Sequence, residues 1–229
     1  ADRIPVWLDG NGNEEQLEVP PRSYSFPRLS PDGKRIELTI QEANDDIWTY
    51  DIENRRFNRL TFQGRNFIPV WTPDSKRIAF RSDQGRFGNL FWIPADGSGK
   101  PEPLMEGQYL YPTPNAWSPD GRSLAFQMND KKGQWNLFVL IPDRERKPQK
   151  FSQTPSDASV WLSFSPDGHW VAYQSVQTGR SEVFVRPFPN PGGVWQVSTD
   201  GGSRPIWART GELLYINGSK MMSVEITTA

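Results

Sequence analysis

A four-residue turn that recurs along the chain constrains the fold more than any other feature of the sequence. Ser-Pro-Asp-Gly occurs three times, at Ser30–Gly33, Ser118–Gly121 and Ser165–Gly168, and related sequences stand at Thr72–Ser75 and Ala208–Gly211. The second residues of these turns lie at 31, 73, 119, 166 and 209, so the steps between them are 42, 46, 47 and 43 residues. A repeat of this length is typical of one four-stranded propeller blade.

The residues on either side of each turn alternate as they do in strands. One apolar residue stands two positions before the proline or its equivalent, and two more stand five and seven positions after it. This period of two predicts that each turn joins two strands. The apolar residues are Leu29, Trp71, Trp117, Phe164 and Trp207, then Ile36, Ile78, Leu124, Val171 and Leu214, then Leu38, Phe80, Phe126, Tyr173 and Ile216. We expect Trp71, Trp117 and Trp207 to be buried between blades, and Trp135, Trp161 and Trp195, which lie outside this register, to be nearer the surface.

Further apolar segments complete each period. A third strand is expected at 46–48, 89–91, 136–138, 182–184 and 220–222, and a weaker fourth at 57–61, 102–105, 149–152 and 195–198. The sequence therefore predicts a single all-β domain over residues 1–229, a β-propeller of four-stranded antiparallel blades.

Two blade counts fit the ends of the chain. The 31 residues up to Pro31 and the 20 after Arg209 together make about one repeat. We therefore predict five blades, with an N-terminal strand closing the last blade and removing exposed sheet edges. Because Ile4–Leu8 resembles a third strand, a six-bladed ring that is incomplete in this chain is the alternative.

Composition and isolated motifs exclude several classes of chemistry. Twenty-six basic and 27 acidic residues leave no field that would draw the surface to nucleic acid, and no apolar run approaches the ~20 residues of a membrane span. The chain has no cysteine and one histidine, His169, with no Gly-x-Ser-x-Gly elbow. The turn aspartates occur once per blade, too far apart to share an ion. We predict no cofactor and no metal site.

The repeat also carries a family resemblance. A Ser-Pro-Asp-Gly turn, an apolar strand and then Asp/Asn-Ile/Leu-Trp/Phe resembles the TolB-like propeller repeat, over nearly all of the chain from Val6 to Ile226. The segments Gly179–Pro189 and Trp195–Gly202 resemble propellers at the C-terminal end of some bacterial serine/threonine kinases and related multidomain proteins. The resemblance implies a bacterial, extracytoplasmic (periplasmic) interaction or sensor module.

The resemblance further implies that ligands bind at the channel mouth, on the face opposite the Ser-Pro-Asp-Gly turns. The loops that join successive blades reach this face, and they are rich in arginine and tyrosine, which often supply binding energy at protein interfaces. The candidate binding residues are Arg22, Tyr24, Arg65, Asn66, Phe67, Tyr109, Tyr111, Asp157 and Arg204. We expect a protein or peptide partner there.

Catalytic alternatives stay open. A glycan-acting propeller hydrolase needs two or three converging carboxylates, and the expected innermost strands contain no Asp or Glu. That scarcity favours a non-catalytic binding module. An accessory propeller of a serine peptidase, whose catalytic domain lies outside this chain, is the third interpretation.

Overall fold

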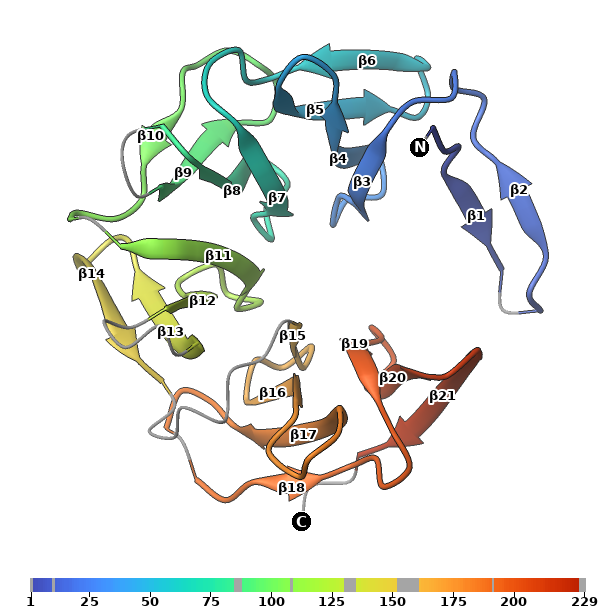
Figure 1. Ribbon diagram of the computed structural model, residues 1–229, viewed down its shortest axis with the longest axis vertical. Helices are drawn as coiled ribbons and strands as arrows, with labels where there is room; N and C mark the ends of the chain where they lie inside the picture. The colour runs from blue at the N-terminus through green and yellow to red at the C-terminus, as the bar shows by residue number, and fades with distance from the viewer. Residues whose placement is uncertain are drawn as a thin grey trace. The chain divides into compact units, whose positions relative to one another are not determined.

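The regular structure of the chain consists of antiparallel β-strands (Figure 1). The computed structural model describes residues 2–9, 11–84, 88–107, 109–129, 135–151, 161–190 and 192–226, and no helix occurs in these ranges. The prediction of an all-β, five-bladed β-propeller is confirmed. The blades fall into two compact units, Ala1–Leu104 with the first two blades and Met105–Ala229 with the last three. A single domain stays a prediction.

The first unit holds one strand pair and two complete blades, each blade running from its first to its fourth strand in chain order. The pair is β1 (Val6–Leu8) and β2 (Glu14–Gln16). The first blade is β3 (Tyr24–Leu29), β4 (Arg35–Gln41), β5 (Asp45–Asp51) and β6 (Arg56–Arg59). The second is β7 (Asn66–Trp71), β8 (Arg77–Ser82), β9 (Asn89–Pro94) and β10 (Glu102–Pro103).

The second unit holds three blades. The third blade is β11 (Leu110–Trp117), β12 (Leu124–Asn129), β13 (Trp135–Ile141) and β14 (Glu145–Lys150). The fourth is β15 (Leu162–Phe164), β16 (Trp170–Ser175), β17 (Glu182–Pro187) and β18 (Trp195–Gln196). The fifth is β19 (Ser203–Trp207), β20 (Glu212–Asn217) and β21 (Lys220–Glu225). Because the described strands pair β1 with β2 and give the fifth sheet three strands, closure by an N-terminal strand stays a prediction.

The repeated turns close as their chemistry predicts. In the first, the Ser30 hydroxyl donates to Asp32 Oδ1 at 2.5 Å, and the same oxygen accepts from the Lys34 N–H at 3.1 Å. Gly33 has a φ of 74°, which glycine adopts without strain. The hydrogen bond from Ser30 holds the pKa of Asp32 below its usual value. Asp74, Asp120 and Asp167 accept the equivalent bonds, so these aspartates serve turn geometry.

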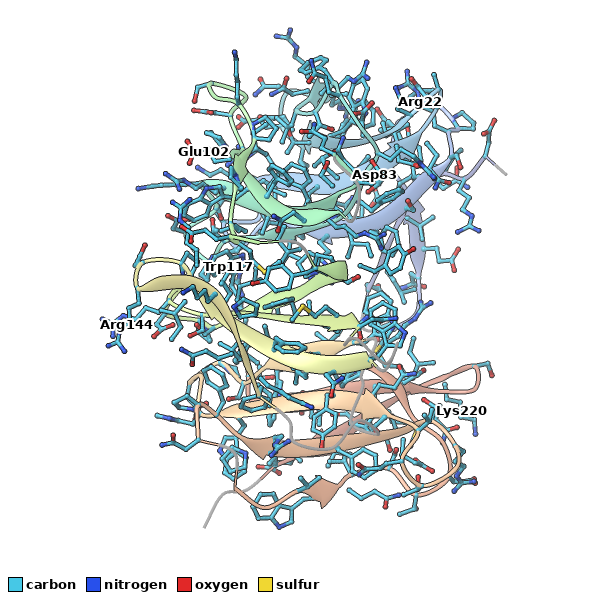
Figure 2. All side chains as sticks on the ribbon, turned by 60° about the vertical axis from the view of Figure 1, so that its left-hand side comes forward. Arg22, Asp83, Glu102, Trp117, Arg144 and Lys220 are labelled. Atoms are coloured by element: carbon cyan, nitrogen blue, oxygen red, sulfur yellow. The ribbon has the colours of Figure 1, made fainter. Side chains whose placement is uncertain are left out.

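Packing between successive blades forms the core within each unit. Ile47 of β5 packs in one cluster with Trp71, Ile78 and Phe80 of the second blade. Figure 2 shows Trp117 among packed side chains, whereas Arg144 projects outward. Trp71 and Trp117 are buried as predicted. Trp207 is only half-buried, because one side of it faces the hollow described below.

The fifth blade departs from the predicted register by one residue. Trp207 pairs with Leu213, so five residues form the turn, whereas Trp71 pairs with Ile78 across six. Because side chains alternate between the faces of a strand, this deletion exchanges the faces of β20. Leu213 and Tyr215 are therefore the buried residues, and the expectation for Leu214 and Ile216, which are half-buried, is corrected.

Candidate functional site

A strained bulge recurs in the first strands of the blades. Phe26, Ile68 and Arg204 have φ values of 54°, 53° and 53°, and each precedes a proline. Each stands three residues before Leu29, Trp71 or Trp207. The pairing of the first and second strands shifts at each of these left-handed residues. Left-handed backbone is unfavourable for these side chains, above all for a β-branched isoleucine, and costs about 1–3 kcal/mol. Bulges of this kind re-aim a side chain and are common beside binding sites.

Tyr111 shares this conformation in the third blade. Its φ is 53°, it precedes Pro112, and the pairing of β11 with β12 shifts just after Leu110. Its side chain is 52% exposed. Phe26, Ile68, Arg204 and Tyr111 therefore share a left-handed conformation before a proline, although Tyr111 stands six residues before Trp117 and the others stand three before their apolar residue.

The loop between the first and second blades presents Arg65. Its Nε and Nη2 lie 2.8 Å from Asp45 Oδ2, and its guanidinium lies 5.1 Å from the centre of the Phe67 ring. The Arg65 N–H donates to Asp83 Oδ1 at 2.6 Å. The Arg65 side chain stays 61% exposed while that of Asp45 is 8% exposed. Asp45 and Phe67 thus fix an exposed cation, which lowers the entropy it loses on binding.

Two predicted contact residues in this unit are buried. Tyr24 is 5% exposed, donates its hydroxyl to the Pro20 carbonyl at 2.8 Å and stacks on Phe57. Asn66 is fully buried, and its Nδ2 donates to the Gln63 carbonyl at 3.1 Å. Each side chain therefore donates to a carbonyl in the loop that precedes its own strand. Arg22 lies partly exposed beside Glu42 at 3.4 Å.

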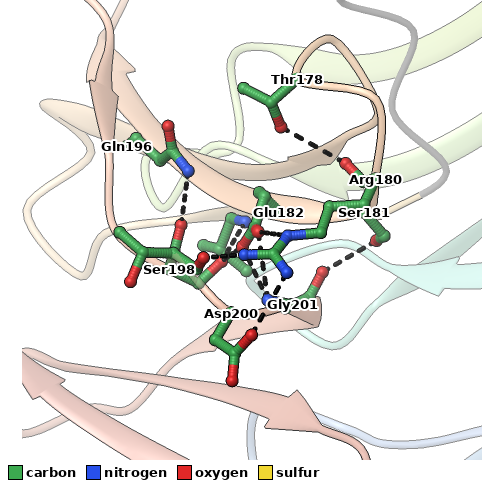
Figure 3. Close-up of polar contacts among 11 residues, drawn as sticks. Thr178, Arg180, Ser181, Glu182, Gln196, Ser198, Asp200 and Gly201 are labelled. Atoms are coloured by element: carbon green, nitrogen blue, oxygen red, sulfur yellow. Dashed lines mark hydrogen bonds and ion pairs between the residues drawn. The ribbon is translucent and has the colours of Figure 1, made fainter.

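The loop between the fourth and fifth blades rests on a buried carboxylate, drawn in Figure 3. Glu182 accepts from the Ser198 hydroxyl, from the Gly201 N–H at 3.1 Å and from Arg180 Nε at 2.5 Å. Arg180 also reaches Asp200 at 3.2 Å. Burial raises the pKa of Glu182, but these bonds and the guanidinium outweigh it and hold the pKa below its usual value. The carboxylate therefore stays charged and keeps the loop in place.

The same brace occurs in the first unit, where Asp46 accepts from the Thr61 hydroxyl at 2.8 Å. In both places that hydroxyl also accepts from the backbone N–H that follows the acid, Ile47 or Val183. Our sequence reasoning missed this support. Its signal is an acid at the start of the third strand and a Thr or Ser just after the fourth.

The braced loop presents Arg204, which is exposed. Its guanidinium lies 5.2 Å from the centre of the Trp161 ring, and its N–H donates to Gln174 Oε1 at 3.1 Å. Tyr109 is half-buried, and burial together with Glu106 raises the pKa of its hydroxyl. Asp157 lies outside the described residues. The candidate contacts with exposed or partly exposed side chains are Arg22, Arg65, Phe67, Tyr109, Tyr111 and Arg204. Arg65 lies with Phe67 in one unit, and Arg204 lies with Trp161 in the other.

Among the described residues, no group of three or more His, Asp or Glu side chains is placed to hold a metal ion. Nor do the described residues include a helix that is long and apolar enough to cross a bilayer.

Comparisons with known proteins place the fold. No protein-family model matches the chain. The Tol-Pal system protein TolB of Anaeromyxobacter dehalogenans (strain 2CP-C) is 34% identical over 96 residues, 41% of this chain and 22% of that protein. The uncharacterized peptidase YuxL of Bacillus subtilis (strain 168) is 28% identical over 213 residues, 80% of this chain and 31% of that one. The chain thus spans less than a third of either relative.

A solved structure agrees. The putative TolB from Agrobacterium tumefaciens superposes with a TM-score of 0.75 at 17% identity, over 89% of this chain and 73% of that one. The fold is a TolB-like β-propeller.

Proposed function

We propose that this propeller is a non-catalytic module that binds a protein or peptide through its inter-blade loops. The observation that carries the proposal is the placement of exposed arginines on aromatic rings, Arg65 on Phe67 and Arg204 on Trp161. Arginine and aromatic side chains held in place by neighbours give large contact area with little further loss of entropy. Exposed Tyr111, on its left-handed bulge, adds a third anchor of the same kind.

A phage-displayed random peptide library tests the proposal without a known partner. Peptides selected on the chain are titrated against wild type, Tyr111→Ala and Arg204→Ala, with Lys34→Ala as the control on the Ser-Pro-Asp-Gly face. The two loop variants should each weaken binding at least tenfold, equivalent to about 1.4 kcal/mol, while the control binds as wild type. Peptides that bind all four proteins equally would contradict the proposal.

We propose further that the module works outside the cytoplasm of a bacterium, as the likeness to a Tol-Pal system protein suggests. A C-terminal position in a kinase-like or other multidomain protein belongs to the same proposal. Fractionation of a bacterium that expresses the natural gene, together with the gene sequence on both sides of this segment, tests both points. A cytosolic product would overturn the location.

A second function has one observation in its favour, the likeness to a protein named a peptidase over 80% of this chain. In that case the propeller is an accessory domain of a serine peptidase. A gene that continues into a hydrolase domain, with peptide cleavage that Tyr111→Ala slows, would favour it over a free-standing binding module. A glycan-acting hydrolase has less support, because none of the first strands β3, β7, β11, β15 and β19 carries an Asp or Glu.

A further inference from the structure

The face that bears the Ser-Pro-Asp-Gly turns has a hollow where the repeat breaks down. Between the fourth and fifth blades, a cavity of about 270 Å³ is lined chiefly by Trp170, Trp207, Asp167, Arg209, Thr210 and Ile226. All of these residues belong to the second unit. The volume lies just below the ~300–1,000 Å³ of typical ligand pockets, so it suits one ring rather than a chain.

The equivalent junction between the first and second blades is filled. There Arg35 places its guanidinium 5.0 Å from the Trp71 ring and donates to the carbonyls of Ser75 and Ala95 at 2.7 and 2.9 Å. The Asp32 N–H also donates to the Ser75 hydroxyl at 3.1 Å. These bonds tie the two turns together across the junction.

Two changes in the sequence open the junction between the fourth and fifth blades. Trp170 stands at the position of Arg35, four residues after the turn proline, and the fifth turn is one residue shorter. A Cβ atom placed on Gly211 would meet nothing within 4 Å, whereas one on Gly168 would lie 3.3 Å from Pro119. The turn of the fourth blade thus packs against that of the third, and the turn of the fifth stands clear of its neighbour.

One acceptor oxygen accompanies the two indoles. Asp167 Oδ1 accepts from the Ser165 hydroxyl and the His169 N–H, so Oδ2 is the oxygen that can accept from a ligand. The Trp207 Nε1 atom is buried, so Trp207 offers a ligand its ring and not its N–H group.

We propose that this hollow binds a single saccharide ring. A pyranose packs its C–H faces against indole rings, and each of its hydroxyls both donates and accepts. A sugar therefore covers the indoles and donates a hydroxyl to Asp167 Oδ2. An apolar peptide side chain would fill the hollow but would not donate to that oxygen. The proposal concerns the turn face and is independent of peptide binding at the inter-blade loops.

Saturation-transfer NMR with a panel of free hexoses and N-acetylhexosamines provides the first test, followed by a titration that monitors tryptophan fluorescence. We expect at least one sugar to bind with a Kd of the order of 1 mM, about 4 kcal/mol. Asp167→Asn keeps an oxygen for the Ser165 bond and replaces the second oxygen by an amide, so binding should weaken at least fivefold. The matched control is Asp120→Asn, in a turn with the same Oδ1 bonds at 2.5 and 3.0 Å.

A second pair of variants separates loss of the site from loss of the fold. Thr210→Trp, at an exposed turn position, should block the hollow and abolish binding, whereas Glu53→Trp, in an exposed turn of the first blade, should not. Thermal unfolding should show that all four variants stay folded. The absence of any binding sugar would overturn the proposal, and so would equal effects of Asp167→Asn and Asp120→Asn. Binding that survives Thr210→Trp would place the sugar elsewhere and also overturn it.

Discussion

A buried acid in the first blade provides a sharp test of how the first and second strands of a blade pack. Glu37 is fully buried and pairs across β3 and β4 with Arg28. The same register positions hold smaller or uncharged pairs in the other blades: Val70 with Ala79, Ala116 with Ala125, Ser163 with Ala172, and Ile206 with Leu214. The first blade therefore places two ionisable side chains where its neighbours have none.

Removing Glu37 alone should cost much more than removing Glu37 and Arg28 together. Glu37→Ala removes the buried acid that interacts electrostatically with the Arg28 guanidinium, for which we expect a loss of about 3 kcal/mol in the free energy of unfolding. Arg28→Val with Glu37→Ala copies the pair of the second blade and should come within about 1 kcal/mol of wild type or exceed it. Urea unfolding of the wild type, both single variants and the double variant completes the cycle. A double variant as unstable as Glu37→Ala would refute the reasoning.

Three further predictions follow from particular residues. Burial outweighs the Arg28 charge and raises the pKa of Glu37 well above its usual value. Between the unfolded and folded pKa the folded state binds more protons, so the free energy of unfolding should fall as pH rises through that window, and Glu37→Gln should remove this fall in urea titrations at a series of pH values. Arg204→Gly should change the free energy of unfolding by less than about 1 kcal/mol, because glycine relieves the left-handed backbone and so offsets the lost contact with Trp161. The same variant should weaken peptide binding. A large loss of stability would show that the role of Arg204 is structural. Trp71→Ala should cost about 3–5 kcal/mol in denaturant unfolding, and Trp207→Ala clearly less, since Trp207 is half-exposed; equal losses would contradict the open junction.

Periodicity predicted the blades because turn and strand chemistry are local. Pro-Asp-Gly closes a turn through its own hydrogen bonds, and alternation assigns the faces of the strands beside it. The same alternation failed at Leu214 because a one-residue deletion in the turn exchanges the faces of β20, and the degraded sequence Ala208–Gly211 hid its length. Counting a fixed number of residues from Arg209 placed Leu214 opposite Trp207, so this count could not detect the deletion.

The candidate contacts were harder to predict because burial in a loop depends on residues distant in sequence. Tyr24 stacks on Phe57, and Asn66 lies beside the carboxylate of Asp46, so both side chains are buried by residues that are distant in sequence. The bulges did have a local signal, an X-Pro pair close before Leu29, Trp71 and Trp207. That signal needs the rule that proline in a strand marks an edge or a bulge.

Isothermal titration of a library-selected peptide tests the central claim, that the inter-blade loops bind a polypeptide partner. Arg65→Ala, Tyr111→Ala and Arg204→Ala change the loops, and Lys34→Ala with Lys76→Ala changes the opposite turns. We predict that each loop variant weakens the Kd at least tenfold, about 1.4 kcal/mol, while the lysine pair leaves it unchanged. Loss of binding in the lysine pair with wild-type affinity in the loop variants would show that the partner binds the other face.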